Sequence, residues 1–423
     1  MILRLLLAVL VVYTVNQFHF DIDLGIPGVN VINLVFGAAL AALILQGRAT
    51  PLAKPFLGTP LRIYFAAATI ATVVAMVARP QSPMEDLTYL KTLLFYPLYY
   101  FLFYYAVRDL QTARRLILLV FIVAAVAGLE AVREGLDYGI GGYSETHRAA
   151  GPFGPDYRSA NRAGVFYAMF IPLFAAPVFF LKGQPFWRLV ALGGLLVLAA
   201  AILFTYSRQS YFIALLALAL MAIRRSVIVA AFCAIVFAIA LPMLPSGAFE
   251  RVQETQQVDE FGQEAVDDST ASRWDIWGGA VVMWSESPIG VGANRFKGLI
   301  GGYSNYPGKD AHNYYVLTLA EAGLQGLFAL LLLVFALWRL GSRLVRDARD
   351  HEALTLAHGF RIAVLAMALG NIYGSPFSEG TVMGIFWALA ALVERQSQLR
   401  AASVPAAAAA KPAPRRALPM VRA

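Results

Sequence analysis

The sequence has little of what a soluble globular protein needs at its surface. Only 14% of its 423 residues are charged, whereas 59% are hydrophobic and the mean hydropathy is +0.64. Soluble domains usually carry about 25% charged and roughly 45–50% apolar residues. The composition therefore excludes a soluble single-core enzyme and indicates a polytopic membrane protein.

Cysteine is nearly absent as well. Cys233 is the only one, and it lies inside an apolar run. A disulfide framework or a cysteine-based metal cluster needs several cysteines, so both are excluded. No P-loop, dinucleotide fingerprint, zinc motif or serine nucleophile elbow occurs either. ATP-driven and hydrolytic chemistry therefore have no support in the sequence.

Long apolar runs are abundant instead. Each approaches the ~20 residues that cross a hydrocarbon core, so we expect an all-α polytopic protein with about 12 transmembrane helices. The first run has no small-residue cleavage signature, and we expect it to be retained. The runs lie at residues 2–18, 29–45, 63–79, 87–106, 116–132, 163–181, 189–206, 209–223, 227–243, 312–338, 360–376 and 380–394.

The positive charge indicates an orientation rather than a nucleic-acid partner. The formal charge is +8 and the pI is about 9.5. With the amino terminus inside, most of the 34 Lys and Arg residues fall in the inner connections and the tail. This matches the positive-inside rule and predicts that both termini are cytoplasmic. The basic inner edge then faces membrane lipids, and we expect no nucleic acid to bind.

Two outer connections are long, at residues 133–162 and 244–311. Long loops on one side of a membrane protein usually carry function, so we expect the chemistry to face outward. The larger loop, between helices nine and ten, contains an amphipathic stretch at 272–284 that predicts an interfacial helix lying on the bilayer.

These loops divide the chain into helical and connecting parts. The last part is rich in Ala, Pro and Arg and is expected to be a disordered cytoplasmic tail. The parts are helices one to five at 1–132, the loop at 133–162, helices six to nine at 163–243, the loop at 244–311, helices ten to twelve at 312–396 and the tail at 397–423.

Ionisable groups at a membrane edge are costly unless they are used or paired. Arg208 lies in the short polar turn Ser207–Arg208 between two spans, where it either reaches lipid phosphate or binds an anionic ligand with its planar fork. Arg273 either makes a local salt bridge with Asp275 or forms a second phosphate clamp.

His312 stands at the outer start of the tenth span. It either caps that helix or acts as a general base, since its ordinary pKa near 6.5 suits proton removal from a sugar hydroxyl. Glu321, nine residues on, is out of phase with it on a regular helix and is expected to be a packed structural carboxylate. Asp21 and Asp23 form a D-x-D pattern that either binds a divalent metal with a lipid diphosphate or is a chance match, and we expect no metal site and no cofactor.

The second half of the chain resembles the O-antigen ligase and O-antigen polymerase superfamily, whose members transfer glycans linked to bactoprenol. Four blocks in order carry the resemblance over roughly 190 to 340, and Arg148 to Phe153 with Asn161 forms a weaker one. The four blocks are Ser207–Arg208; Arg273–Trp274 with Trp277 and Trp284; Ser287 to Phe296 (SPIGVGANRF); and Ala311–His312–Asn313 followed by Glu321 to Gly326 (EAGLQG).

The resemblance implies an inner-membrane glycosyltransferase of the GT-C-like type. Such an enzyme takes glycan from undecaprenyl diphosphate on the periplasmic face, without nucleotide sugar or metal, and inverts the anomeric carbon. Arg208 and Arg273 would stabilise the leaving diphosphate, and His312 matches the histidine to which the family's general-base role is ascribed.

Further residues of these blocks are expected to contact substrate. The arginines either line an entrance for phosphates or are solvated loop charges. The glycines either let the loop backbone approach substrate or a helix end, or form an ordinary turn. The tyrosine either stacks on sugar or belongs to an interfacial aromatic belt. The expected contacts are Arg148, Arg158, Gly290, Gly292, Asn294, Arg295, Asn313 and Tyr314.

Rival functions remain open at this point. The leading hypothesis is a ligase that joins O-antigen to lipid A core. A polymerase of O-antigen or exopolysaccharide repeats would use the same donor and nearly the same residues. A transporter or flippase would predict paired inverted repeats and broken helices with ionisable groups near the midplane, and we find no such pairing in the sequence. A purely structural scaffold would leave Arg208, Arg273 and His312 replaceable.

Overall fold

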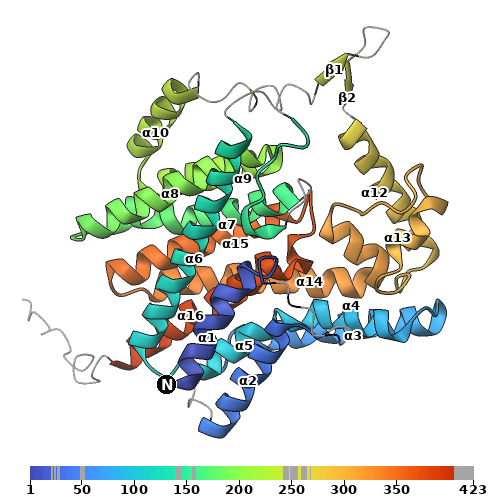
Figure 1. Cartoon of the computed structure of the whole chain (residues 1–423), viewed down its shortest axis with the longest axis horizontal. Coiled ribbons are helices and arrows are strands. Elements are labelled where there is room, and N and C mark those ends of the chain that lie inside the picture. Colours follow the sequence, from blue (N-terminus) through green and yellow to red (C-terminus); the bar gives the residue numbers. More distant parts are fainter. Residues whose placement is uncertain are drawn as a thin grey trace, which may run out of the picture.

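The computed structural model describes residues 1–20, 22, 25, 29–47, 53–139, 144–154, 159–241, 247, 256–258, 264–266 and 268–403. Within these ranges the protein is built almost wholly of helices (Figure 1). Two three-residue strands, β1 (Gln256–Val258) and β2 (Glu264–Val266), pair antiparallel in the large loop. The expected helical membrane protein is thus confirmed in its broad form.

Every predicted span coincides with a helix or a pair of helices. In the first half these are α1 (Ile2–Val15), α2 (Val31–Gln46), α3 (Gly58–Ala78), α4 (Pro83–Phe95), α5 (Leu98–Ala106) and α6 (Leu110–Tyr138). In the second half they are α7 (Ala160–Phe180), α8 (Pro185–Thr205), α9 (Arg208–Arg225), α10 (Val227–Ala240), α14 (Tyr314–Asp347), α15 (His351–Gly370) and α16 (Gly380–Ser403).

Fewer helices than twelve meet the requirements for crossing a membrane. Among the described residues, 6 helices are long and apolar enough, namely α3, α6, α7, α8, α14 and α15. Three apolar helices are shorter, at Ile2–Val15, Val31–Gln46 and Val227–Ile239. The expected span at 87–106 is divided into α4 and α5, because Pro97 lacks the N–H that a continuous helix would use.

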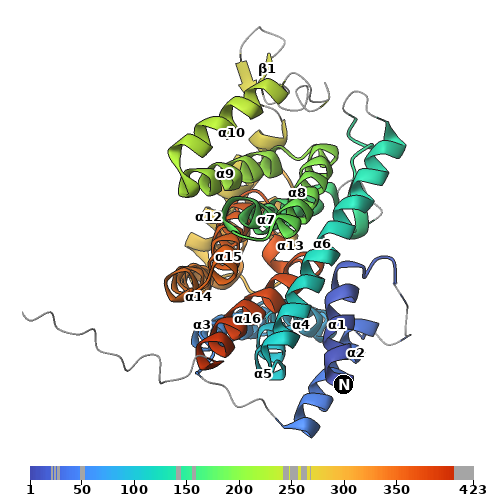
Figure 2. The same ribbon diagram turned by 90° about the vertical axis from the view of Figure 1, so that its left-hand side faces the viewer.

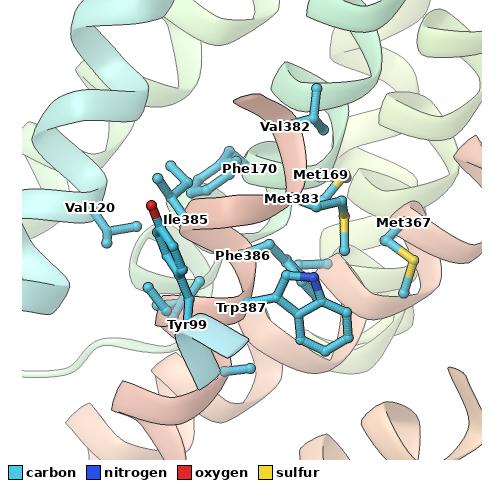
Figure 3. Packing of buried hydrophobic residues seen from close by; sticks show 14 of the residues in the cluster. Tyr99, Val120, Met169, Phe170, Met367, Val382, Met383, Ile385, Phe386 and Trp387 are labelled. Atoms are coloured by element: carbon cyan, nitrogen blue, oxygen red, sulfur yellow. The ribbon is translucent and has the colours of Figure 1, made fainter. Parts of the chain in front are cut away.

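Helix α16 forms the centre of the bundle. All its side chains from Thr381 to Gln396 are buried, as expected of a helix that is enclosed by other helices. Figure 3 shows Trp387 and Phe386 of this helix packed among Met169, Phe170 and Met367 from α7 and α15.

Two helices are longer than the predicted spans, because α6 continues to Tyr138 and α16 continues to Ser403.

Ion pairs mark one end of the bundle, which we call the terminal end. The starts of α1 and α6 are joined by Arg4 and Asp109 at 2.9 Å. Arg114 of α6 binds Glu352 of α15 at 2.8 Å, and Arg400 of α16 contacts the same carboxylate at 2.6 Å. The opposite end, which we call the loop end, carries α12 and the strands, and Figures 1 and 2 show the amino terminus far from it.

The loop end holds three short elements of the large loop. These are α12 (Asp268–Glu286), α13 (Phe296–Leu299) and the 3₁₀ turn η4 (Ile300–Gly302). The expected interfacial helix at 272–284 lies within α12, but one face of it is covered by protein. Ile276, Ala280 and Met283 are buried in a small core that includes Ala320 of α14, whereas Val281 and Val282 are about half exposed at 47% and 50%.

Candidate active site

The chain reverses between α8 and α9 in only two residues. Tyr206 takes the left-handed conformation with φ +47°, and α9 begins at Arg208 directly after Ser207. Tyr206 and Ser207 are buried at 5% and 3% exposure, whereas Arg208 is partly exposed. The tight turn therefore places Arg208 at the start of α9.

This turn is held from behind by Arg148. Its side chain is only 7% exposed; Nε donates to the carbonyl of Thr205 at 2.9 Å, and one terminal nitrogen donates to Oδ1 of Asn161 at 2.6 Å. The amide of Ala149 also donates to the carbonyl of Phe204 at 2.9 Å. These contacts direct Arg148 toward the protein, where it positions the Ser207–Arg208 turn.

A second turn, residues 370–374 after α15, connects the elements of the site. The side chain of Gln209, next to Arg208, donates through Nε2 to the carbonyl of Gly370 at 2.7 Å. The amide of Tyr314, at the start of α14, lies 2.9 Å from the carbonyl of Asn371 and 3.1 Å from that of Gly374. The starts of α9 and α14 therefore both rest on the 370–374 turn.

Helix α12 reaches the same turn through its aromatic and cationic side chains. The guanidinium carbon of Arg273 lies 5.6 Å from the ring centroid of Tyr373, within cation–π range. The ring of Trp277 lies 5.6 Å from that of Tyr373, and its Nε1 donates to the carbonyl of Ala311 at 2.7 Å. Arg273 is thus fixed beside the segment that carries His312.

His312 occupies an unusual backbone conformation, with φ +47°. The following Asn313 caps α14, since its Oδ1 accepts hydrogen bonds from the amides of Tyr315 and Val316 at 3.0 and 3.1 Å. His312 is therefore not the helix cap, and its side chain remains exposed. The left-handed backbone points to a position fixed by its surroundings.

The charges around His312 favour its neutral form. Desolvation by the adjoining protein lowers the pKa of His312, and the positive charge of Arg273 lowers it further. Lys297 and Lys309 act in the same direction, whereas Asp310 opposes them. A neutral imidazole can accept a proton near neutral pH, as a general base must.

A partly exposed carboxylate, Glu379, lies near the start of α16. Glu379, just before α16, binds Arg162 of α7 at 3.1 Å. Burial raises the pKa of Glu379, and the ion pair with Arg162 limits that rise.

The loop from Ser287 to Phe296 packs on a break in α14. Gly323 leaves the helical conformation with φ 67° and ψ −169°. The amide of Val291 donates to the carbonyl of Ala320 at 2.9 Å, and that of Gly292 to Glu321 at 3.0 Å. The loop therefore binds backbone carbonyls of α14 just before the break.

Gly290 and Gly292 allow this close packing. Both have positive φ, at 99° and 100°. A Cβ on Gly290 would lie 2.4 Å from the carbonyl oxygen of Glu321, and one on Gly292 would lie 2.5 Å from Cα of Ala75. Of the alternatives considered for these glycines, the structure favours close approach to helices.

Glu321 is a packed structural carboxylate, as expected. It is 7% exposed, accepts a hydrogen bond from the amide of Phe296 at 3.1 Å and another from the hydroxyl of Tyr89 at 3.2 Å. It fastens the end of the loop to α14.

Two expected substrate contacts face the interior of the protein. Arg295 is 2% exposed, and both its terminal nitrogens bind Asp86 at 2.7 Å, so the guanidinium is occupied in a buried ion pair. Tyr314 is 4% exposed and its hydroxyl lies 2.9 Å from that of Tyr64. This geometry argues against direct contact of Arg295 or Tyr314 with substrate and gives both a structural role.

The remaining expected substrate contacts differ in their exposure to solvent. Asn294 is exposed with φ 61°, so its side chain is accessible from the loop end. Asn313 is 7% exposed and its amide oxygen caps α14. Arg158 lies outside the described residues, and so do Asp21 and Asp23.

Two side chains of the site were missed from the sequence. The ring of Tyr373 makes a cation–π contact with Arg273. Gln209 joins the Ser207–Arg208 turn to the 370–374 turn. Gln209 follows Arg208 directly and could have been included on that ground. Tyr373 lies 100 positions after Arg273 and belongs to no recognised block, so no sequence signal placed it here.

Comparison with known proteins gives one family. Residues 193–331 match the family described as O-antigen ligase. The matched region includes Arg208, Arg273 and His312 together with the loop from Ser287 to Phe296. The chain matches none of the curated proteins.

Proposed function

We propose that this chain, a member of the O-antigen ligase superfamily through residues 193–331, transfers O-antigen glycan en bloc from undecaprenyl diphosphate to a sugar hydroxyl of lipid A core. The observation that carries the proposal is that α9, α12 and α14 meet on the 370–374 turn, so the elements bearing Arg208, Arg273 and His312 share one end of the bundle.

The proposed setting is the bacterial inner membrane, with the loop end in the periplasm and both termini in the cytoplasm. All apolar helices, about twelve, would then embed in the bilayer in a GT-C-like arrangement. The ion pairs of the terminal end support this orientation, because they gather the helix ends that the positive-inside rule predicts to be cytoplasmic.

Arg208 and Arg273 would bind the leaving group. When the bond between the anomeric carbon and the diphosphate oxygen breaks, its electron pair stays on that oxygen and negative charge grows there. Two fixed guanidiniums stabilise this charge more strongly in the transition state than in the bound donor. Because the two guanidiniums stabilise the negative charge of the leaving diphosphate themselves, the proposed reaction is metal-independent.

His312 would act on the acceptor. Its neutral imidazole takes the proton of the attacking sugar hydroxyl while the oxygen forms its bond to the anomeric carbon. Attack opposite the departing diphosphate inverts that carbon. The lowered pKa of His312 supports this role, because the base must be unprotonated before each transfer.

Reconstituted transfer tests the proposal. Purified undecaprenyl-diphosphate glycan is offered to the wild-type protein in vesicles, with or without lipid A core and with or without EDTA. We expect a product that requires lipid A core and forms equally in EDTA. Chain extension without lipid A core would instead assign a polymerase, loss in EDTA would assign a metal-dependent reaction, and donor movement across the bilayer without transfer would assign a flippase.

A further inference from the structure

A cavity of about 490 Å³ opens at the terminal end, away from the proposed active site. It lies between the end of α14, the start of α15 and the end of α16. Its volume falls in the range of about 300–1,000 Å³ that is typical of ligand pockets. Nothing in the proposed glycan transfer uses this cavity.

Four arginines line the cavity against two carboxylates, Asp347 and Glu394. Two of the four are engaged, because Arg343 binds Asp347 at 3.3 Å and Arg400 binds Asp350 and Glu352. Within the described part of the chain, the other two, Arg346 and Arg349, are exposed and have no hydrogen-bond or ion-pair partner. The rim therefore offers two guanidiniums to an anion.

The carboxylate of Glu394 does not compensate these charges at the rim. It is 4% exposed, accepts a hydrogen bond from the amide of Phe56 at 3.0 Å and another from the hydroxyl of Tyr100 at 2.5 Å. Its oxygens are thus directed into the bundle. The cavity presents an excess of positive charge to whatever enters it.

The cavity combines this basic rim with an apolar wall. Leu340, Leu344, Leu356 and Val393 line it together with the arginines. A free inorganic anion would gain nothing from that wall, whereas a lipid headgroup carries its phosphate on an apolar glycerol and acyl body. Basic pockets between membrane helices bind such headgroups, and arginine forks bind phosphate bidentately.

We propose that this cavity binds the phosphate-bearing headgroup of an anionic phospholipid, with Arg346 and Arg349 on the phosphate. The chain's own tail is a poor alternative occupant on charge. Residues 404–423 contain Lys411, Arg415, Arg416 and Arg422 and no acid, so the rim repels them.

Lipid binding to the purified full-length protein tests this site. After delipidation in detergent, phosphatidylglycerol or phosphatidylcholine is titrated and bound lipid is counted by mass spectrometry of the intact protein. Near an anionic lipid each arginine is worth a factor of about five in affinity. We expect Arg346→Gln/Arg349→Gln to bind phosphatidylglycerol roughly 30-fold more weakly than wild type.

A matched control removes equal charge elsewhere. Arg115→Gln/Arg225→Gln takes two exposed arginines that do not line the cavity, and we expect wild-type binding. Ala353→Trp fills the cavity without removing charge, and we expect it to displace phosphatidylglycerol. Unfolding temperatures of all three variants establish that they are folded.

Three results would overturn the proposal. They are equal affinity for phosphatidylcholine, equal weakening by both double variants, and displacement of phosphatidylglycerol by millimolar inorganic phosphate alone, which would assign a soluble anion. Because lipid binding is measured without glycan substrates, its outcome is independent of the proposed transferase activity.

Discussion

At the scale of single residues, desolvation and neighbouring charges together set the pKa of His312. Arg273, Lys297 and Lys309 lower the pKa of His312, and Asp310 raises it. Since the imidazole works as a base only when neutral, kcat/KM for transfer is expected to rise with pH through the pKa of His312. Because the pKa of His312 is lowered, the rise is expected at a pH below 6.5, the ordinary pKa of histidine.

Two exposed loop residues allow this pKa to be moved in both directions. Lys309→Gln removes a positive charge, so the pKa of His312 rises and the acidic limb of the pH profile moves to higher pH. Asp310→Asn removes the opposing charge, so the limb moves to lower pH. The measurement is kcat/KM between about pH 5 and 8. If the acidic limb stays in place in both variants, or moves in the same direction in both, the assignment of His312 as the base is contradicted.

Replacement of arginine by lysine distinguishes the effect of the planar guanidinium from the effect of positive charge in the proposed diphosphate site. Arg208→Lys and Arg273→Lys keep the charge but lose the planar fork, and we expect each to lower kcat at least tenfold; removal of a comparable transition-state donor costs about 10²–10³-fold. Arg133→Lys, an exposed arginine of α6, serves as control and should retain full activity. Equal rates in all three variants would argue against a diphosphate clamp.

The sequence could nominate candidate site residues but could not show which of them are buried. Arg208, Arg273 and His312 could be selected because each belongs to a short block with a known order. Arg295 has its partner Asp86 209 positions away, and Arg148 has its partner Thr205 57 positions away. Nothing local distinguishes an arginine that will be buried from one that stays in solvent, so for both residues the sequence leaves open a phosphate entrance or a solvated loop charge.

At the scale of elements, the buried pair of Arg295 and Asp86 holds the loop onto α4. Both side chains are nearly inaccessible, at 2% and 1%. Removing one partner leaves an uncompensated buried charge, so we expect Asp86→Ala to lower the free energy of unfolding by about 3–5 kcal/mol. Denaturant unfolding in detergent measures this loss.

The exposed pair of Arg343 and Asp347 is the matched control. Both side chains are 51% exposed, and Asp347→Ala should cost less than about 1 kcal/mol. The double replacement Asp86→Leu/Arg295→Met should recover much of the lost stability, because no charge then remains buried. If Asp86→Ala and Asp347→Ala cost the same, the pair does not hold the loop.

Hydrophobic runs located the helices well but not their interruptions. Each predicted span has a helical counterpart, since apolar length is the dominant signal. The break between α4 and α5 at Pro97 was readable from the proline. The break in α14 at Gly323 was not, because it depends on hydrogen bonds from the loop that begins at Ser287.

At the scale of the whole molecule, the proposed orientation places the loop end outside and the terminal end inside. With Cys233→Ala as background, a single cysteine can report each side. Lys309→Cys should react with a membrane-impermeant thiol reagent in intact cells, whereas Arg115→Cys should react only after permeabilisation; both positions are exposed. The reverse pattern would invert the topology and move the active site to the cytoplasm.

The common 370–374 turn is a property of the folded molecule that the sequence did not indicate. Arg208, Arg273 and His312 come from separate elements, and the 370–374 turn that links those elements contains no residue of the recognised blocks. Its role depends on contacts between residues far apart in the sequence, such as Gln209 with Gly370, which is 161 positions away.

The central proposal is that His312 is the general base of glycan transfer at the loop end of the bundle. Its most direct test is single-turnover transfer from purified undecaprenyl-diphosphate glycan to lipid A core by wild type, His312→Ala and the exposed control His351→Ala, with donor binding measured in parallel. We predict that His312→Ala binds donor normally but transfers about 10²–10⁴-fold more slowly, while His351→Ala matches wild type. Transfer by His312→Ala within about threefold of wild type would contradict the account, since a general base contributes far more than that.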